Sequence, residues 1–519
     1  MHLSAGRLGA AIVLGLGLIT VNAEEQRTHA GTALAVVQGS ALPAIDRGLR
    51  DQDPPRAART RRDADHVQSD SGRPMRGSII VKFKDDAPRG AAAAATVQVS
   101  GELVGRSAWA NFDIVDIPTE ADPETAASTM RARPDVEYAQ PRYLNHAMAR
   151  PNDTLYGNQW NFPAIDMERA WDIQPGATPD IIVAVLDSGM AFRTVTMRYT
   201  SRFPFRVTPG GPLYPALGTV DVPFAAAPEL GASGSSRFVS PRDFIWNNEL
   251  PLDLDAHGTH VAGTVGQLTN NGSGTAGMAY NVRLMPVKVI QGLWDDVFSS
   301  PFEGTDDVVA RGIRYAADNG AKVINLSIGR EDGGAAPVVT DAIRYAVGKG
   351  VFLAVAAGNT RADGNQPNRL AQGAREIDGM IAVGAVGRTL DLAFYSTTAS
   401  YVEISAPGGD QRQGGTSAGI LQQTLDLDLL ETFERPVAQF GPPRADAFAY
   451  SYFQGTSMAT PHVSGFAALL MQQGITSPAA IELAMKQFAT DKGTPGLDNS
   501  FGAGLINPRA TLRGLGLAR

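Results

Sequence analysis

The chain contains no cysteine among its 519 residues. That absence excludes a disulfide framework, a zinc site built on thiolates and a cysteine nucleophile. Basic residues are in deficit as well, since 45 Lys and Arg stand against 53 Asp and Glu, a formal net charge of −8 at pH 7. Because phosphate binding needs a basic surface, nucleic acid is not an expected partner. After the N-terminal segment, no stretch has the roughly 18 apolar residues of a spanning helix, so we expect no membrane span.

What the chain does have at its start is the pattern of a secretory signal peptide, over residues 1–23. Arg7 precedes an apolar run from Leu8 to Val21, and the small residue Ala23 stands before two glutamates. A buried N-terminal helix is the alternative. The pattern predicts a secreted protein, extracellular or periplasmic, whose stability rests on packing and on any bound ions.

Two segments follow that differ in composition. Residues 24–76 are rich in Arg, Asp, Ala and Pro and lack apolar periodicity, which is typical of a disordered linker. Residues 77–147 predict a small α+β unit of the ferredoxin-like kind. Its expected strands are Ser78–Phe83, Phe112–Ile117 and Val136–Ala139, and its expected helix begins at Asp122-Pro123 and runs to about Arg133.

Short apolar runs alternate with helical patterns through residues 148–519. The runs are Ile181–Leu186, Arg283–Val289, Ala321–Leu326, Val351–Val355 and Met380–Gly384, and the helical patterns lie at about 257–268, 304–319 and 338–349. Apolar, β-branched runs of this length suit a parallel sheet that is covered on both faces. We therefore predict an α/β domain with a doubly wound, mostly parallel sheet, helices on both faces, and ligands at the carboxyl ends of the strands.

Four chemically useful side chains stand at the ends of these elements. Asp187 and Asn359 each follow an apolar strand-like run. His257 opens a helical pattern, and its unperturbed pKa near neutrality suits a general base. Ser457 opens the apolar helix within GTSMATPHVSG, with Pro461 expected in the first turn, where free N–H groups and the helix dipole can stabilise an oxyanion.

Each of these residues also has a simpler interpretation. Asp187-Ser188-Gly189 and Gly358-Asn359 are ordinary turn sequences, and Ser457 could be a plain helix N-cap. His257 could be a packed residue at a helix start, or it could bind a metal together with His260, although no glutamate follows in the HExxH manner. Because an acid, a base, an amide donor and a hydroxyl are all present at one predicted rim, we favour catalysis.

Six motifs, in this order, resemble those of the subtilisin-like serine protease family, the subtilases. They are VAVLDSGM around Asp187, HGTHVAGTV around His257, VINLSIG at 323–329, AAGN ending at Asn359, SAPGG at 405–409 and GTSMATPHVSG around Ser457. The resemblance covers roughly 151–515 and implies a subtilisin-like fold and a serine endopeptidase that acts on proteins or peptides. Residues 77–145 resemble the family's inhibitory propeptide, whose tail would lie in the cleft.

The resemblance implies a role for each matching residue. Ser457 would be the nucleophile, His257 the general base and then the general acid, and Asp187 the residue that orients the imidazole. Asn359 and the backbone N–H of Ser457 would form the oxyanion hole.

Two short segments would contact the substrate. Ser327, Ile328 and Gly329 would form an edge that pairs with extended substrate as an added strand. Ala356, Ala357 and Gly358 would line the pocket before the scissile bond. Small residues there imply a roomy, uncharged pocket, so we expect a preference for large apolar side chains.

The resemblance also implies a structural Ca²⁺ ion. Thr269, Asn271, Ser273 and Thr275 lie in a segment that resembles the family's calcium loop, and Asp153 resembles its N-terminal carboxylate ligand. Oxygen-only ligation suits Ca²⁺. An ordinary Asn/Gly turn is the alternative.

Several features stand outside the family pattern. Segments 191–240 and 408–449 look like insertions that could shape substrate access or contact partners. The second contains Ser417 within a GxSxG sequence, the nucleophile elbow of a lipase or esterase, but no apolar strand precedes it. Asp253 and Asp255 could bind an ion or solvate a loop, and we favour the loop.

We expect a zymogen. The segment from residue 24 to about 147 would assist folding and act as an intramolecular inhibitor until the enzyme removes it by a cut between Leu144 and Pro151. We expect the product to be a monomer. The competing hypothesis is a secreted binding protein that uses a protease-like fold.

Overall fold

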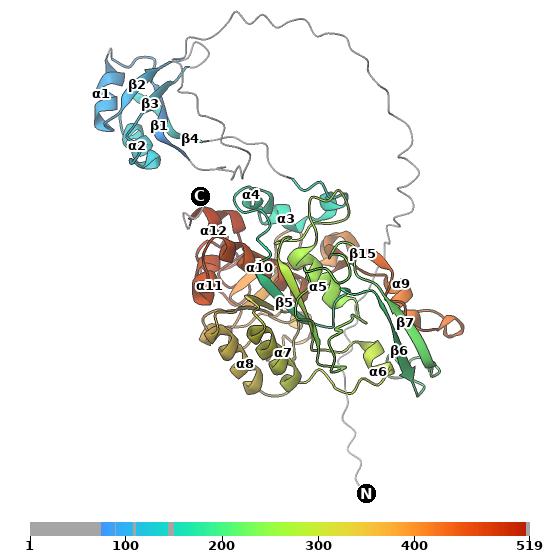
Figure 1. Cartoon of the computed structure of the whole chain (residues 1–519). Helices are drawn as coiled ribbons and strands as arrows, with labels where there is room; N and C mark the ends of the chain where they lie inside the picture. The colour runs from blue at the N-terminus through green and yellow to red at the C-terminus, as the bar shows by residue number, and fades with distance from the viewer. Residues whose placement is uncertain (1–73, 89, 107–110, 144–149, 515–519) are drawn as a thin grey trace, which may run out of the picture.

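The computed structural model describes residues 74–88, 90–106, 111–143 and 150–514. The predicted signal peptide, nearly all of the predicted linker and most of the predicted cleavage region lie outside these residues. The described residues form a small N-terminal unit and a large α/β unit (Figure 1). Within them, no helix combines the length and the apolar character that crossing a membrane requires.

The small unit has a four-stranded antiparallel sheet and two helices. Its elements are β1 (Pro74–Phe83), α1 (Ala91–Gln98), β2 (Glu102–Gly105), β3 (Asp113–Asp116), α2 (Pro123–Arg131) and β4 (Val136–Tyr143), with the strands ordered β2-β3-β1-β4. This order is the ferredoxin-like one, as predicted. The predicted helix is confirmed as α2, whose N-cap Asp122 accepts a hydrogen bond from the Thr125 N–H. The sequence analysis missed α1, because an alanine run has no apolar periodicity that would mark a buried face, and it also missed the four-residue strand β2.

Seven strands form the central sheet of the large unit. In spatial order they are β13 (Ile404–Pro407), β12 (Met380–Val386), β11 (Phe352–Ala356), β10 (Val323–Leu326), β5 (Ile182–Asp187), β9 (Arg283–Lys288) and β8 (Arg242–Asp243). All neighbouring pairs are parallel. The five strands predicted from apolar runs are all present.

Helices cover both faces of this sheet, as predicted (Figure 1). The larger core cluster joins α5 (His257–Gly266) and α10 (Thr456–Gln472) to one face, and the second cluster joins α7 (Asp306–Asp318) and α8 (Pro337–Gly348) to the other. Successive residues of β5 alternate between the two clusters, because side chains on a strand point to opposite faces. The remaining helices of four or more residues are α3 (Asn161–Ala164), α4 (Met167–Trp171), α6 (Leu293–Val297), α9 (Leu427–Leu430), α11 (Pro478–Gln487) and α12 (Pro508–Gly514).

The order of the strands reverses at β5. Along the chain, β9 is added on one side of β5 and β10 on the other. Such a reversal opens a crevice at the carboxyl ends of the strands, where ligands bind in open α/β sheets. Asp187 ends β5 and Ser327 directly follows β10, so both lie at this crevice.

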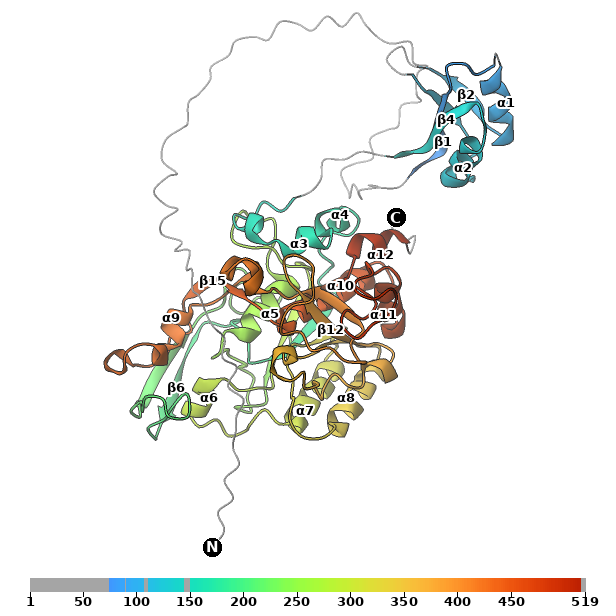
Figure 2. The ribbon, with the colours of Figure 1, turned by 180° about the vertical axis from the view of Figure 1, so that it is seen from behind.

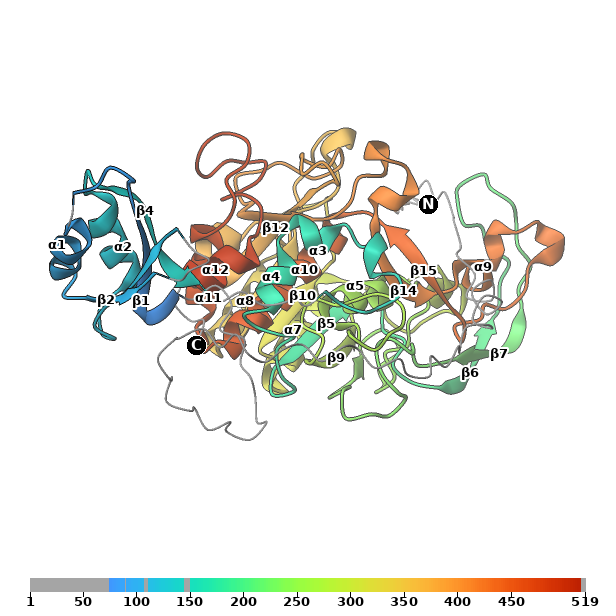
Figure 3. The ribbon, with the colours of Figure 1, turned by 90° about the horizontal axis from the view of Figure 1, so that it is seen from above.

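The two insertions pack against each other. The first contains the hairpin of β6 (Val195–Ser201) and β7 (Gly218–Phe224), and the second joins β14 (Ile420–Leu425) to β15 (Phe448–Phe453). Phe205 and Tyr214 of the first insertion contact Phe440 of the second, with ring centroids 5.5 and 5.0 Å apart. Figures 2 and 3 show β6 and α9 at one end of the large unit. The insertions therefore form one lobe although they are far apart in the sequence.

Candidate active site

Asp187 and His257 meet at the crevice. Asp187 is fully buried, and His257 is the first residue of α5. His257 Nδ1 lies 2.7 Å from Asp187 Oδ1, which also accepts a hydrogen bond from the Ser188 N–H at 2.8 Å. A carboxylate at Nδ1 keeps the ring proton there, so that Nε2 can accept another proton.

A tight crossing of β5 and α5 brings these two residues together. Gly258 is the second residue of α5, and a Cβ at this position would lie 2.1 Å from Gly189 O and 3.1 Å from Asp187 Cβ. Only a glycine lets the helix start approach the strand end so closely. The Gly258 N–H donates to Ser188 Oγ at 3.0 Å, which fastens the crossing.

Asp253 supports the same crossing from the loop before α5. Its Oδ1 accepts hydrogen bonds from Ser188 Oγ and from the N–H groups of Asp255 and Ala256. Its Oδ2 accepts from the N–H and the hydroxyl of Thr259. With both oxygens engaged by protein donors, Asp253 fits the favoured interpretation as a loop residue and not that of an ion ligand.

The carboxylates around His257 change the pKa of its imidazole. Burial lowers this pKa, but Asp187 raises it through its charge and its hydrogen bond, and Asp255 and Asp253 raise it further. The net result is a raised pKa. The surroundings thus stabilise the imidazolium, the species that forms when a histidine takes a proton from a serine.

Ser457 is the second residue of α10. Backbone N–H groups in the first turn of a helix have no acceptor within that helix. The chain enters α10 through Gly455, whose φ of 153° and ψ of 161° are accessible essentially only to glycine. Ser457 Oγ donates a hydrogen bond to Ser327 O at 3.0 Å. Pro461 lies in the second turn of α10, one turn later than predicted, because the helix starts at Thr456.

Asn359 lies beside Ser457 with a defined orientation of its amide. Its Oδ1 accepts hydrogen bonds from the Thr456 N–H at 2.9 Å and from the Thr456 hydroxyl at 3.0 Å. Because the oxygen faces Thr456, the NH₂ group faces away from it. Asn359 Nδ2 and Ser457 N both lie 3.6 Å from the position that a Cβ on Gly455 would occupy. The two donors therefore border the same small space.

The six residues predicted to contact substrate lie side by side. Residues 327–329 follow β10 and residues 356–358 end and follow the neighbouring strand β11. Asn368 joins the two segments, since its Nδ2 donates to Ala356 O at 2.7 Å and to Ile328 O at 3.2 Å. The sequence analysis missed Asn368, which lies in a segment without helix or strand and carries no local signal beyond a turn-like composition.

The alternative catalytic and metal residues do not fit their roles. Ser417 is exposed and lies in a 3₁₀ turn that leads into β14, whereas a nucleophile elbow requires a following helix. His260 is fully buried, and its Nε2 donates to the backbone carbonyl oxygens of Ile420 and Ser451. Burial lowers the pKa of His260 to about 3. The esterase hypothesis and the histidine metal pair are therefore both wrong.

The predicted calcium loop packs against two buried carboxylates. Asp153 Oδ2 accepts from the Asn270 N–H at 2.9 Å, while its Oδ1 is buried without a hydrogen-bond partner. Glu229 is buried as well, and Asn271 Nδ2 donates to it at 3.3 Å. Burial raises the pKa of both carboxyl groups, and the charge of Asp153 raises the pKa of Glu229 further. The sequence analysis missed Glu229, which comes from the first insertion.

The other predicted loop residues use their side chains within the protein. Thr269 Oγ1 donates to Gln267 O, and Thr275 Oγ1 donates to Gln422 Oε1. The Ser273 N–H donates to Asn271 Oδ1 at 2.8 Å, and the Ser273 hydroxyl donates to the Glu229 carboxylate. Thr269, Ser273 and Thr275 could therefore reach an ion through their backbone carbonyl groups. The described residues contain no group of three or more His, Asp or Glu side chains that could hold a metal ion.

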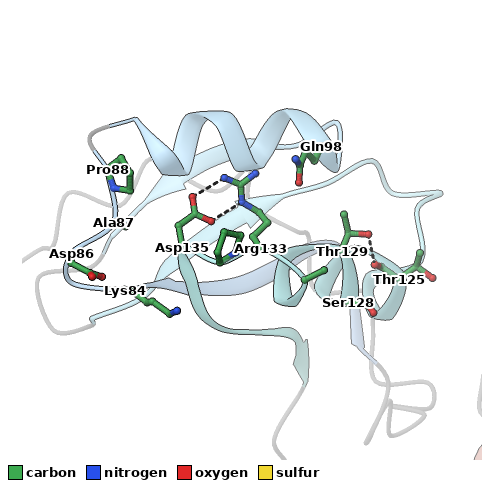
Figure 4. Close-up of a pocket in the computed structure, with 12 residues that line it drawn as sticks. Lys84, Asp86, Ala87, Pro88, Gln98, Thr125, Ser128, Thr129, Arg133 and Asp135 are labelled. Atoms are coloured by element: carbon green, nitrogen blue, oxygen red, sulfur yellow. Dashed lines mark hydrogen bonds and ion pairs between the residues drawn. The ribbon is translucent and has the colours of Figure 1, made fainter.

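An open cavity of about 1050 Å³ lies in the small unit, away from the crevice (Figure 4). Arg133 and Asp135 border it and form two hydrogen bonds of 2.9 and 2.7 Å with each other. None of the predicted site residues lines this cavity. The candidate active site is thus defined by the side chains at the crevice.

The model of the subtilase family matches residues 178–504, which is more than half of the chain. The chain belongs to the subtilase family. A model of the fervidolysin N-terminal prodomain matches residues 61–142 of this subtilase. The protein is therefore a subtilisin-like serine endopeptidase with a prodomain. The competing hypothesis of a secreted binding protein is rejected.

Relatives of this subtilase are themselves proteases. A thermophilic serine proteinase of Bacillus sp. (strain AK1) is 30% identical over 79% of this chain and 81% of its own length. An extracellular protease of Xanthomonas campestris pv. campestris is 29% identical over 76% of this chain and 62% of its own. The solved structure of fervidolysin from Fervidobacterium pennivorans has a TM-score of 0.50 at 24% identity, covers 85% of this chain and 62% of that one, and shows the shared fold.

Proposed function

We propose that Asp187, His257 and Ser457 form the catalytic triad of this endopeptidase. His257 Nε2 takes the hydroxyl proton of Ser457 as Oγ attacks the peptide carbonyl, and it then gives that proton to the leaving amine. Asp187 keeps the Nδ1 proton in place and stabilises the imidazolium. Water then hydrolyses the acyl-enzyme with the same histidine as base. The observation that carries the proposal is the 2.7 Å contact between His257 Nδ1 and Asp187 Oδ1.

Substrate binding would release the nucleophile for this reaction. Ser457 Oγ donates to Ser327 O, and a backbone carbonyl at a sheet edge is the acceptor that an added substrate strand uses. When a substrate N–H takes over Ser327 O, the Ser457 hydroxyl is free to turn toward His257 Nε2. Residues 327–329 thus act as the substrate edge.

Asn359 Nδ2 and the Ser457 N–H would form the oxyanion hole. Both nitrogens lie 3.6 Å from the position that a Cβ on Gly455 would occupy, and the orientation of the Asn359 amide is fixed. These two observations support this role. Donors held in place before the reaction stabilise the charge that develops on the carbonyl oxygen without reorganisation. The small residues at 356–358 leave room for a large apolar side chain before the scissile bond.

The prodomain would inhibit the enzyme until it cuts itself free. The matched prodomain and the presence of this unit directly before the peptidase unit support a zymogen. The extracellular relative and the predicted signal peptide support secretion. Removal of residues 24 to about 147 would then release a monomeric peptidase.

A structural Ca²⁺ ion would be held where Asp153 and Glu229 face the loop at 269–275. Asp153 Oδ1 lacks a protein partner, and neither carboxylate has an ion-pair partner in the part of the chain that the structure describes. Carboxylate, amide and backbone carbonyl oxygens are the ligands that Ca²⁺ prefers. The ion would offset the repulsion between the two carboxylates and fasten the loop.

A pair of serine variants tests the proposed function. The full chain and its Ser457→Ala and Ser417→Ala variants are made in a protease-free translation system and treated with a serine-directed fluorophosphonate. We expect the wild type and Ser417→Ala to lose the prodomain and to be labelled at Ser457, and Ser457→Ala to keep the prodomain and stay unlabelled. Loss of the prodomain from Ser457→Ala would contradict autoprocessing, and activity that depends on Ser417 would contradict the triad.

A further inference from the structure

Helix α10 lacks one backbone hydrogen bond at the nucleophile. In an α-helix the N–H of residue i+4 donates to the carbonyl of residue i, so the carbonyl of Ser457 should accept from residue 461. Residue 461 is a proline inside the helix and has no N–H to donate. The Ser457 carbonyl accepts instead from Ser327 Oγ, at 2.8 Å. The side chain of Ser327, which directly follows β10, thus replaces the missing helical donor.

Two further buried side chains continue this contact. Asn325 Nδ2 donates to Ser327 Oγ at 2.9 Å, and Ser464 Oγ donates to Asn325 Oδ1 at 2.8 Å. Asn325 and Ser464 are fully buried. Asn325 lies two residues after Val323 on β10, so it faces the same core as α10. An amide in such a core is costly unless its polar atoms are paired, and both of these atoms are.

The hydrogen bonds have a fixed direction. Ser464 donates its hydroxyl proton to the oxygen of Asn325, which turns the Asn325 NH₂ group toward Ser327. That NH₂ group occupies a lone pair of Ser327 Oγ, so the Ser327 proton is directed to the Ser457 carbonyl. A carboxylate at position 325 could only accept, and it would draw the Ser327 proton away from Ser457.

We propose that Asn325 and Ser464 are positioning residues for the nucleophile. They orient the Ser327 hydroxyl, which donates to the Ser457 carbonyl the hydrogen bond that Pro461 cannot donate. In this way they fix the backbone that carries the Oγ and the N–H of Ser457. This proposal rests on the proposed role of Ser457. It predicts that breaking the chain of hydrogen bonds lowers the rate of the chemical step and leaves substrate binding almost unchanged.

The first experiment breaks the series of hydrogen bonds from Ser464 to Ser457 at two points. Ser327→Ala removes the hydroxyl that reaches Ser457, and Asn325→Asp keeps the shape of the side chain but removes its donor. For each purified enzyme, fluorophosphonate titration counts active sites, and kcat and KM are measured per active site on a peptide anilide. We expect kcat to fall about 5- to 150-fold, the range for a buried acceptor that is left without its donor, with KM within twofold.

The second experiment restores the helical donor. Pro461→Ala supplies an N–H at position 461, so we expect kcat of Ser327→Ala/Pro461→Ala to exceed that of Ser327→Ala at least threefold. Thr460→Val is the matched control, because Thr460 is also buried in α10 but donates to Thr456 O instead of Ser457 O. We expect Thr460→Val to lower the melting temperature and to leave kcat within twofold.

The outcomes separate this proposal from the proposed function. If the wild type is labelled at Ser457 but Ser327→Ala and Asn325→Asp keep the wild-type kcat, the positioning role is refuted and the triad stands. A double variant no faster than Ser327→Ala also refutes it. If Ser457 of the active wild type is not labelled, the triad itself fails, and the positioning role fails with it.

Discussion

Replacing Asn359 by leucine should lower kcat about 10²- to 10³-fold and leave KM nearly unchanged. Leucine has a similar shape but no N–H, so the variant loses one of the two donors that border the space over Gly455. The loss of one side-chain donor from an oxyanion hole costs about 2.7–4 kcal/mol of transition-state stabilisation. The ground-state carbonyl carries little charge, which is why the effect falls on kcat.

Thr456 gives this prediction a graded second point. Thr456→Val removes the hydroxyl that donates to Asn359 Oδ1 at 3.0 Å but keeps the backbone N–H that donates at 2.9 Å. One of the two bonds that orient the amide remains. A net loss of about 0.5–1.5 kcal/mol per hydrogen bond corresponds to a roughly 2- to 12-fold lower kcat. Thr456→Ser keeps the hydroxyl and should stay within twofold of the wild type.

The double variant decides whether Thr456 acts through Asn359. Once Asn359 is leucine, the Thr456 hydroxyl has no amide to orient, so Asn359→Leu/Thr456→Val should be about as slow as Asn359→Leu alone. The assay is steady-state hydrolysis of a peptide anilide at constant pH, normalised to titrated active sites. A double variant whose loss equals the product of the two single losses refutes the coupling. An Asn359→Leu enzyme with raised KM and normal kcat refutes the oxyanion role.

Three further predictions concern pH, calcium and the crossing of β5 with α5. With His257 as the proposed general base, activity needs the neutral form of its imidazole. Nearby carboxylates raise the pKa of His257, so kcat/KM should rise with pH through a value above that of an ordinary histidine. Asp255→Asn should move this rise to lower pH, and a rise that does not move would contradict the electrostatic account. EDTA should lower the melting temperature of the wild type, because an ion at 100 times its Kd adds about 2.7 kcal/mol to the free energy of unfolding. If EDTA lowers the melting temperature of Glu229→Gln by as much as that of the wild type, Glu229 is not a ligand. Gly258→Ala puts a Cβ 2.1 Å from Gly189 O, so we expect kcat to fall at least about tenfold. The free energy of unfolding, measured in urea, should fall by about 1–3 kcal/mol. Normal kinetics would mean that the crossing of β5 and α5 can relax.

The sequence alone determined the architecture and the four principal candidates. Buried parallel strands appear as apolar runs, and each run predicted in the large unit became a strand of the central sheet. Because the carboxyl ends of such strands meet at one edge, Asp187 and Asn359 could be expected near each other before any contact was known. His257 and Ser457 were readable as helix starts. Helix α1 was missed because a run of alanines has no alternation of apolar and polar residues that predicts a helix.

The tertiary structure alone decided which neighbours complete the site. Glu229 comes from an insertion and Asn368 from an irregular segment, and neither has a periodic pattern that points to its partner. Of the hydrogen bonds that lead from Ser464 to the Ser457 carbonyl, the bond from Ser464 to Asn325 and the bond from Ser327 to Ser457 join residues 139 and 130 positions apart. Local sequence fixes where a strand or helix begins and which face it buries, whereas these contacts depend on how distant elements pack. The sequence shows Pro461 within the helix that follows Ser457, but only the packing of α10 against the sheet shows that the Ser327 hydroxyl replaces the missing N–H.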